Sequence, residues 1–72
     1  GDEKELIQGL ILVAAALVHY QKDENTICLS VLGRALKKLH SKSGEYYKIN
    51  VDMVKQKTIE ILDKKEIFTF TF

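Results

Sequence analysis

The sequence contains no proline and no tryptophan, and its 72 residues include a single cysteine and four glycines. Because Cys28 is alone, a disulfide within the chain is excluded, and an unpaired cysteine fits a reducing compartment better than secretion. The absence of proline removes the residue that most often interrupts a helix. The opening GDEKE is acidic and polar where a signal peptide would be basic, so we predict a soluble, cytoplasmic protein.

An excess of charge of one sign is also lacking. Eleven basic and ten acidic residues give a net charge of +1, which argues against the strongly basic surface of a nucleic-acid-binding protein. A chain of this length forms one domain at most and buries only about 60% of its unfolded surface. Association with another chain is therefore an expected source of stability. We predict one helical domain over residues 1–66 and an apolar tail over residues 67–72.

The most apolar segment spans residues 6–20, with the sequence LIQGLILVAAALVHY. Every residue from 10 to 18 is apolar, and a helix that is hydrophobic all round is buried on several faces or lies in a membrane. The unbroken run is about half of the ~20 residues that a membrane span requires. The segment therefore predicts the central helix of a bundle, and Asp2 with Glu5 forms a pattern similar to a capping box at its start.

A second helix is predicted to begin at Asp23 or Asn25, either of which can accept a hydrogen bond from the first-turn amides. Gly44 is predicted to end it, because glycine readily adopts the left-handed conformation that closes a helix. Apolar residues at helical spacing predict its buried face: Cys28, Leu32, Ala35, Leu36 and Leu39.

A short loop over residues 45–48 precedes a third predicted helix, which Asn50 can cap and whose first turn contains Asp52. Ile49 and Val54 have the spacing of a hydrophobic staple. The predicted buried face comprises Val51, Val54, Thr58, Ile61 and Leu62. Together these elements predict an all-α fold, a three-helix antiparallel bundle with the apolar first helix in the middle.

Two features of this bundle predict contact with a further segment. The second and third helices can cover two sides of the first, which leaves the side with Leu12, Ala15 and Ala16 for a second copy, another protein or a further helix. The tail over residues 67–72 alternates apolar and polar residues, a strand period that no helix can pair with. We expect the short, extended tail to pack irregularly on its own helices, to join a neighbouring chain or to stay loose.

The segments IQGLILVAAALVHYQKDE, LSVLGRALKKL and EYYKINVDMV resemble, in order and spacing, the small helical proteins of the domain of unknown function 309 family. The resemblance covers about residues 5–62. Lys48 departs from it, because the family commonly has glycine in that turn. The motif suspected of function in the family, His-x-x-x-Glu-x-x-aromatic, lies on a helix upstream of the matching segment and does not occur here, so the resemblance implies no site residue.

Chemical candidates are few. His19 and Asp23 lie one turn apart, but a metal site needs three or four ligands, and a histidine hydrogen-bonded near the turn is the simpler interpretation. Cys28 with a histidine could form a nucleophile and base, yet it lies on the predicted buried face, where a thiol behaves as a small hydrophobe. Glu60 and Asp63 share a face with Lys57 and Lys64, which predicts a solvated surface.

A basic cluster follows in the second half of the second helix, where cations are favoured by the helix dipole. Its members are Arg34, Lys37, Lys38, His40 and Lys42. Anion or nucleic-acid binding is an alternative, although no aromatic is interleaved for base stacking. Tyr46 and Tyr47 are predicted to anchor the loop over the core.

We therefore predict no catalytic, cofactor-binding or metal-binding residue. The sequence favours a non-enzymatic helical protein that acts through self-association or partner binding. The alternative is a remnant or fragment of a metal-dependent enzyme whose ligands lie on the family's upstream helix.

Overall fold

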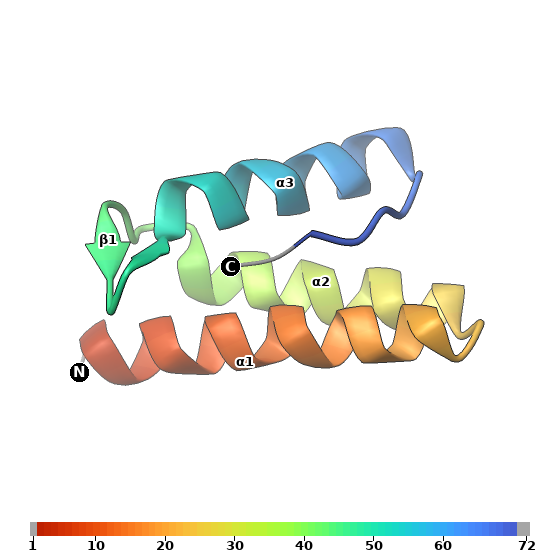
Figure 1. Ribbon diagram of the computed structural model, residues 1–72, viewed down its shortest axis with the longest axis horizontal. Coiled ribbons are helices and arrows are strands. Elements are labelled where there is room, and N and C mark those ends of the chain that lie inside the picture. The colour runs from red at the N-terminus through yellow and green to blue at the C-terminus, as the bar shows by residue number, and fades with distance from the viewer. Residues whose placement is uncertain (1, 71–72) are drawn as a thin grey trace.

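The computed structural model describes residues 2–70, with side chains from residue 3 onward, and most of this part is helical (Figure 1). The helices are α1 (Asp2–Gln21), α2 (Asn25–Leu39) and α3 (Val51–Lys64). A two-stranded antiparallel hairpin, β1 (Glu45–Tyr46) and β2 (Ile49–Asn50), lies between α2 and α3. The predicted helical class is thus correct, with a small sheet added. The capping role predicted for Asp2 and the last two residues of the tail lie outside the described side chains.

Consecutive helices run in opposite directions, and α2 lies between the other two in the view of Figure 1. α2 packs on both α1 and α3, and its closest packing is along α1. The prediction that the first helix occupies the middle is therefore wrong. Hydrophobicity around a whole helix does not determine its neighbours, and here one side of α1 faces away from the bundle.

The core is one cluster to which all three helices contribute. The predicted apolar faces of α2 and α3 are confirmed, except that Leu36 and Leu62 are only half-buried. Thr58 is the one polar side chain buried among the described residues, and its hydroxyl donates to the Val54 carbonyl at 2.8 Å. The fully buried larger side chains are Val13, Cys28, Leu32, Leu39, Val51, Val54, Thr58 and Ile61.

The ends of the helices depart in part from the sequence prediction. At α3 the prediction is confirmed, because Asn50 Oδ1 accepts a hydrogen bond from the Met53 amide at 3.0 Å. At α2 the predicted start at Asn25 is confirmed, but the N-cap is Glu24 with no side-chain capping bond, so the capping role expected of Asp23 or Asn25 is wrong. Asp23 instead lies in the turn before α2, with φ 62°.

Gly44 has the predicted left-handed conformation, with φ 86°, but it does not end α2. The helix ends at Leu39, where the Lys55 side chain donates to the carbonyls of His40 and Lys42. Gly44 lies in the loop that follows, and it contacts the start of α3 through two hydrogen bonds. Its carbonyl accepts from the Val51 amide at 2.8 Å, and its amide donates to Asp52 Oδ2 at 3.2 Å.

The hairpin replaces the predicted loop over residues 45–48. Tyr47 and Lys48 have φ values of 47° and 66°, so both central residues of the turn are left-handed, as in a type I′ turn. Such turns usually contain Asn-Gly or Asp-Gly, and neither is present here. Because the usual residues are missing, the sequence pattern did not indicate the hairpin.

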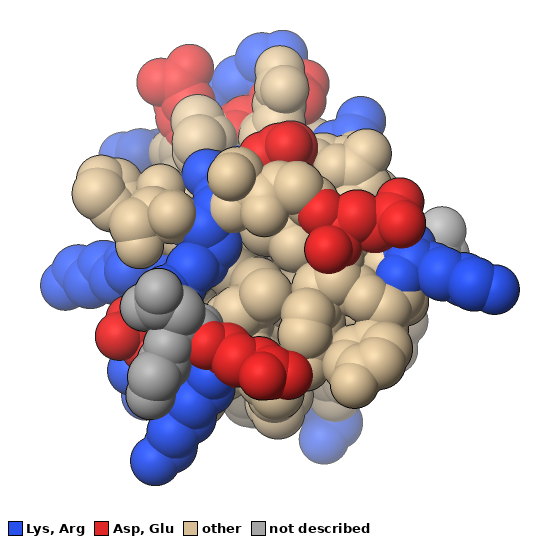
Figure 2. Space-filling model, turned by 90° about the vertical axis from the view of Figure 1, so that its left-hand side faces the viewer, with Lys and Arg blue, Asp and Glu red and all other residues tan. Residues whose placement is uncertain are grey.

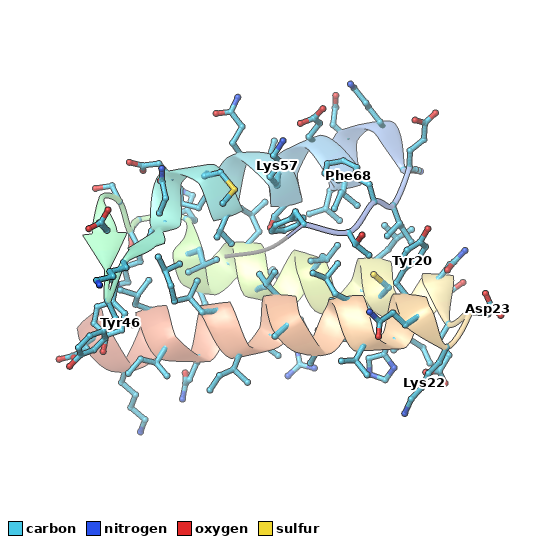
Figure 3. All side chains as sticks on the ribbon, in the orientation of Figure 1. Tyr20, Lys22, Asp23, Tyr46, Lys57 and Phe68 are labelled. Atoms are coloured by element: carbon cyan, nitrogen blue, oxygen red, sulfur yellow. The ribbon has the colours of Figure 1, made fainter. Side chains whose placement is uncertain are left out.

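The described part of the tail, residues 67–70, packs on its own chain. After Lys64, the described residues form no helix or strand, and Ile67, Phe68 and Phe70 are half-buried against the core. Lys57 Nζ lies 5.7 Å from the centroid of the Phe68 ring, and both side chains are labelled in Figure 3. Phe70 and Thr69 line a shallow hollow with Leu17 and Gln21, so the tail runs back from α3 toward α1.

Candidate interaction surface

One side of α1 stays exposed in the folded chain and is apolar over most of its length. Ile7, Ile11, Ala14 and Val18 recur at intervals of three and four residues and therefore share one helix face. The exposed fractions of Ile7, Ile11 and Val18 are 39%, 61% and 48%, and Ala14 is also exposed. Figure 1 shows no other element on the outer side of α1. We call these four residues the α1 strip.

The α1 strip is not the side that the sequence analysis expected to be uncovered. Ala16 is fully buried, and Leu12 and Ala15 are half-buried. The reason is that α2 packs against α1 at Gly9, whose missing side chain lets Leu39 approach closely. This contact turns the Ala16 side of α1 inward and the α1 strip outward. The expectation of an uncovered apolar side is correct, but its position is wrong.

The predicted basic cluster is divided between three places. Arg34 and Lys38 line a groove with Gln8, Ile11 and Leu12 of α1, so they lie beside the α1 strip. Lys37 and His40 line a different hollow, with Gly33 and Leu36. The Lys42 backbone accepts a hydrogen bond from Lys55. The five residues therefore do not line one common hollow, although Arg34, Lys37 and Lys38 are neighbours on α2 at spacings of three and four residues.

Two further lysines lie at the ends of the α1 strip. Lys4 and Glu3 precede Ile7 by three and four residues within α1, and Lys22 lies in the turn that follows the end of α1 at Gln21. Both lysines are exposed, and Lys22 projects outward beyond the end of α1 in Figure 3. At the hairpin end of the bundle, basic side chains project around the margin, and acidic side chains lie among them and nearer the centre (Figure 2).

His19, a candidate metal ligand together with Asp23, makes a hydrogen bond to a different residue. His19 Nδ1 donates to Glu24 Oε1 at 2.8 Å, which links the end of α1 to the start of α2. This confirms a hydrogen-bonded histidine near the turn, with Glu24 as a partner that the sequence analysis did not identify. Asp23 is exposed. Within the described residues, no group of three or more His, Cys, Asp or Glu side chains could hold a metal ion.

Cys28 is fully buried, and burial raises the pKa of its thiol. A raised pKa lowers the fraction of thiolate, the form that acts as a nucleophile. His40 lies twelve residues further along the chain, about 18 Å at the helical rise, which is too far for a base. The interpretation of Cys28 as a small core hydrophobe agrees with its position.

Tyr46 joins the hairpin to the first turn of α1. Its hydroxyl donates to Glu3 Oε1 at 2.6 Å, and its ring is half-buried against the core. The hydrogen bond to Glu3 raises the pKa of Tyr46 to about 12. Tyr47, by contrast, is 82% exposed and touches only the edge of the Tyr46 ring, 4.6 Å between centroids, so its predicted anchoring role is wrong.

Glu60 and Asp63 lie on the outer surface of α3, and Lys64 Nζ lies 3.4 Å from Glu60 Oε1. This agrees with the predicted solvated surface, although Lys57 contacts the Phe68 ring instead of a carboxylate. Exposed pairs of this kind contribute little to stability.

No helix among the described residues is long and apolar enough to cross a bilayer. No family model, curated protein or solved structure matches this chain. The surface itself must therefore support any functional conclusion.

The sequence did not show that the α1 strip would be the exposed face. From Leu10 to Val18 every residue is apolar, so residues at helical spacing form an apolar row on every side of the helix. The one usable signal was Gly9, since a glycine within an apolar helix often marks a close approach of a neighbouring element.

Proposed function

We propose that this protein is a non-enzymatic helical interaction module, in which the α1 strip pairs with a helix of a second copy or of another protein. The observation that supports the proposal is the exposure of Ile7, Ile11 and Val18 along one face of a folded helix. Scattered apolar residues need no explanation, whereas a contiguous apolar row is typical of a binding surface. Helices recognise such a row through anchors at i, i+4 and i+7.

Ile11→Glu tests this proposal, because it places a charge at the most exposed position of the α1 strip. Ile59→Glu is the matched control, since Ile59 lies on α3 and is 49% exposed. The readouts are sedimentation equilibrium, for self-association, and titration with a designed helical peptide that has a leucine face and uncharged polar residues. We expect association in at least one assay, lost in Ile11→Glu and kept in Ile59→Glu. Absence of both kinds of association, or equal behaviour of the two variants, would contradict the proposal.

We also propose membership in the domain of unknown function 309 family. Lys48 occupies the turn position where that family commonly has glycine, and its φ of 66° is a conformation that favours glycine. A helix with the family's His-x-x-x-Glu motif is then one candidate partner for the α1 strip.

The second candidate function, a fragment of a metal-dependent enzyme, follows from the same resemblance. Metal analysis of the purified protein separates it from the first proposal. Zinc, iron or manganese retained at one equivalent through gel filtration would favour the enzyme fragment and contradict a non-enzymatic role.

A further inference from the structure

A groove between α1 and α2 combines apolar and basic side chains. It is lined by Gln8, Ile11, Leu12, Arg34 and Lys38. Ile11 is 61% exposed and Leu12 is half-buried, so the α1 side of the groove presents apolar surface to solvent. The volume of the groove is about 330 Å³, near the lower end of the ~300–1,000 Å³ of small-molecule sites. A small ligand is therefore the kind of occupant that fits it.

The two cations of the groove lie on the same side of α2. Arg34 and Lys38 are one helical turn apart, which places them on one face. Lys38 Cβ lies only 3.1 Å from the position that a Cβ atom would occupy at Gly9, so the stem of Lys38 packs against α1. Within residues 3–70, neither Arg34 nor Lys38 forms an ion pair or a side-chain hydrogen bond. The groove thus contains two cations without a counter-ion from the described part of the chain.

No acidic residue lines the groove. α2 contains no Asp or Glu, and α1 contains none after Glu5. Glu3 and Glu5 are exposed and precede Gln8 by five and three residues, and Asp23 follows Leu12 by eleven, about 16 Å at the helical rise. Glu5 is thus the one acidic residue of α1 within a turn of the groove, and the two cations outnumber it. An anion is therefore favoured in the groove itself, although the wider surface has charges of both signs.

From this arrangement we propose that the groove binds a single-chain amphiphile with an oxyanion head group, the chemistry shared by alkyl phosphates and alkyl carboxylates. The head group lies between Arg34 and Lys38, and the alkyl chain lies along Ile11 and Leu12. The planar guanidinium group matches the paired oxygens of a phosphate or a carboxylate. Like charges one turn apart destabilise a helix slightly, and a bound anion removes this repulsion. The inference goes beyond the proposed function, because its ligand is a small molecule.

Titration with decyl phosphate below its critical micelle concentration, followed through amide chemical shifts, tests the inference. We expect saturable binding, with the largest shifts at the residues that line the groove. Decyl maltoside has the same chain with an uncharged head group, and we expect it to bind about tenfold more weakly because two exposed charge contacts are lost. Inorganic phosphate is also expected to bind at least about tenfold more weakly, because it has no apolar chain to bury.

Lys38→Gln and Lys37→Gln form a matched pair of substitutions at adjacent positions of α2. Each removes one positive charge, but Lys38 lines the groove, whereas Lys37 lines the separate hollow with Gly33. We expect Lys38→Gln and Arg34→Gln each to weaken binding of decyl phosphate about threefold to fivefold, and Lys37→Gln to change it by less than about twofold. The amide spectra of the ligand-free variants show whether each is folded.

Three outcomes would overturn the inference: no saturable binding of decyl phosphate, equal binding of decyl phosphate and decyl maltoside, or equal weakening by Lys37→Gln and Lys38→Gln. Vesicles of phosphatidylglycerol distinguish a free amphiphile from a lipid surface. Sedimentation with these vesicles, without binding of monomeric decyl phosphate, would assign the cations to a membrane surface and contradict the inference. The pairing of the α1 strip with a helix is tested separately by Ile11→Glu.

Discussion

Gly9 of α1 lies so close to Leu39 of α2 that a Cβ atom added at Gly9 would be 2.7 Å from both Cγ and Cδ2 of Leu39. The same atom would lie 3.1 Å from Lys38 Cβ. Leu39 is fully buried, so its side chain has little room to move. The absence of a side chain at Gly9 thus allows α1 and α2 to pack closely on the side of α1 that contains Gly9.

Gly9→Ala is therefore expected to destabilise the protein, although alanine is intrinsically the better helix former. Overpacking of a core contact costs about 1–3 kcal/mol, which exceeds the ~1 kcal/mol gained in helix propensity. Gly33→Ala is the control, because nothing lies within 4 Å of a Cβ atom at that helical position. We expect it to raise the free energy of unfolding by about 0.5–1 kcal/mol. Chemical denaturation measures the free energy of unfolding of both variants. If both variants were more stable than the parent, the close contact at Gly9 would be contradicted.

Asn50→Ala is expected to lower stability by about 1 kcal/mol, because it removes the side-chain acceptor for the Met53 amide at the start of α3. Asn25→Ala is the matched control at α2, where Glu24 is the N-cap. A change within about 0.5 kcal/mol is expected there. If the two substitutions cost the same in urea denaturation, the assignment of the α2 cap is wrong.

Tyr46 is expected to ionise near pH 12 in the folded protein. Its folded pKa lies above the ordinary value of about 10, so the Glu3 bond stabilises the fold fully below about pH 10. This contribution is lost as the pH rises through about 12. Glu3→Gln should lower the pKa of Tyr46 toward its ordinary value. Alkaline titration followed by tyrosinate absorbance measures the shift, and the difference from Tyr46→Phe assigns the signal. An unchanged titration in Glu3→Gln would contradict the bond.

Cys28 is expected to be unreactive toward a chromogenic disulfide reagent in the native protein, because its thiol is fully buried and its pKa is raised by burial. The rate should increase steeply across the urea unfolding transition and reach that of a free thiol once the chain is unfolded. Immediate reaction of one thiol per chain without denaturant would show that the α2 core contact is open.

Phe68→Ala is expected to lower stability by about 1–2 kcal/mol, because it removes a half-buried ring from the core and from Lys57. Thr69→Ala, at the exposed neighbouring position, is the control. The molecular mass, and the way the melting temperature varies with protein concentration, should be the same in both variants as in the parent. A concentration-dependent loss in Phe68→Ala alone would show that the tail packs on a neighbouring chain instead.

The sequence was sufficient wherever short-range chemistry decides the structure. The buried faces of α2 and α3 follow from apolar residues at helical spacing, and the Asn50 cap from a side chain that reaches an amide three residues away. The sequence was insufficient where a turn or a helix cap lacks the residue types that usually form it. The hairpin turn at Tyr47 and Lys48 lacks glycine and asparagine, and the α2 cap is a glutamate whose carboxylate binds His19 instead.

By itself, the sequence determined that this chain is helical, that its first helix has more apolar surface than two neighbours can cover, and that no chemical cluster stands out. The tertiary structure alone decided that α2 lies between α1 and α3, that the tail returns to its own core, and that Ile7, Ile11, Ala14 and Val18 remain exposed. The physical reason lies in what hydrophobic periodicity can show. It identifies the residues that lie in one row along a helix. When every row is apolar, it does not indicate which row will be buried. In the structure the buried side of α1 is the one on which Gly9 lets Leu39 approach closely.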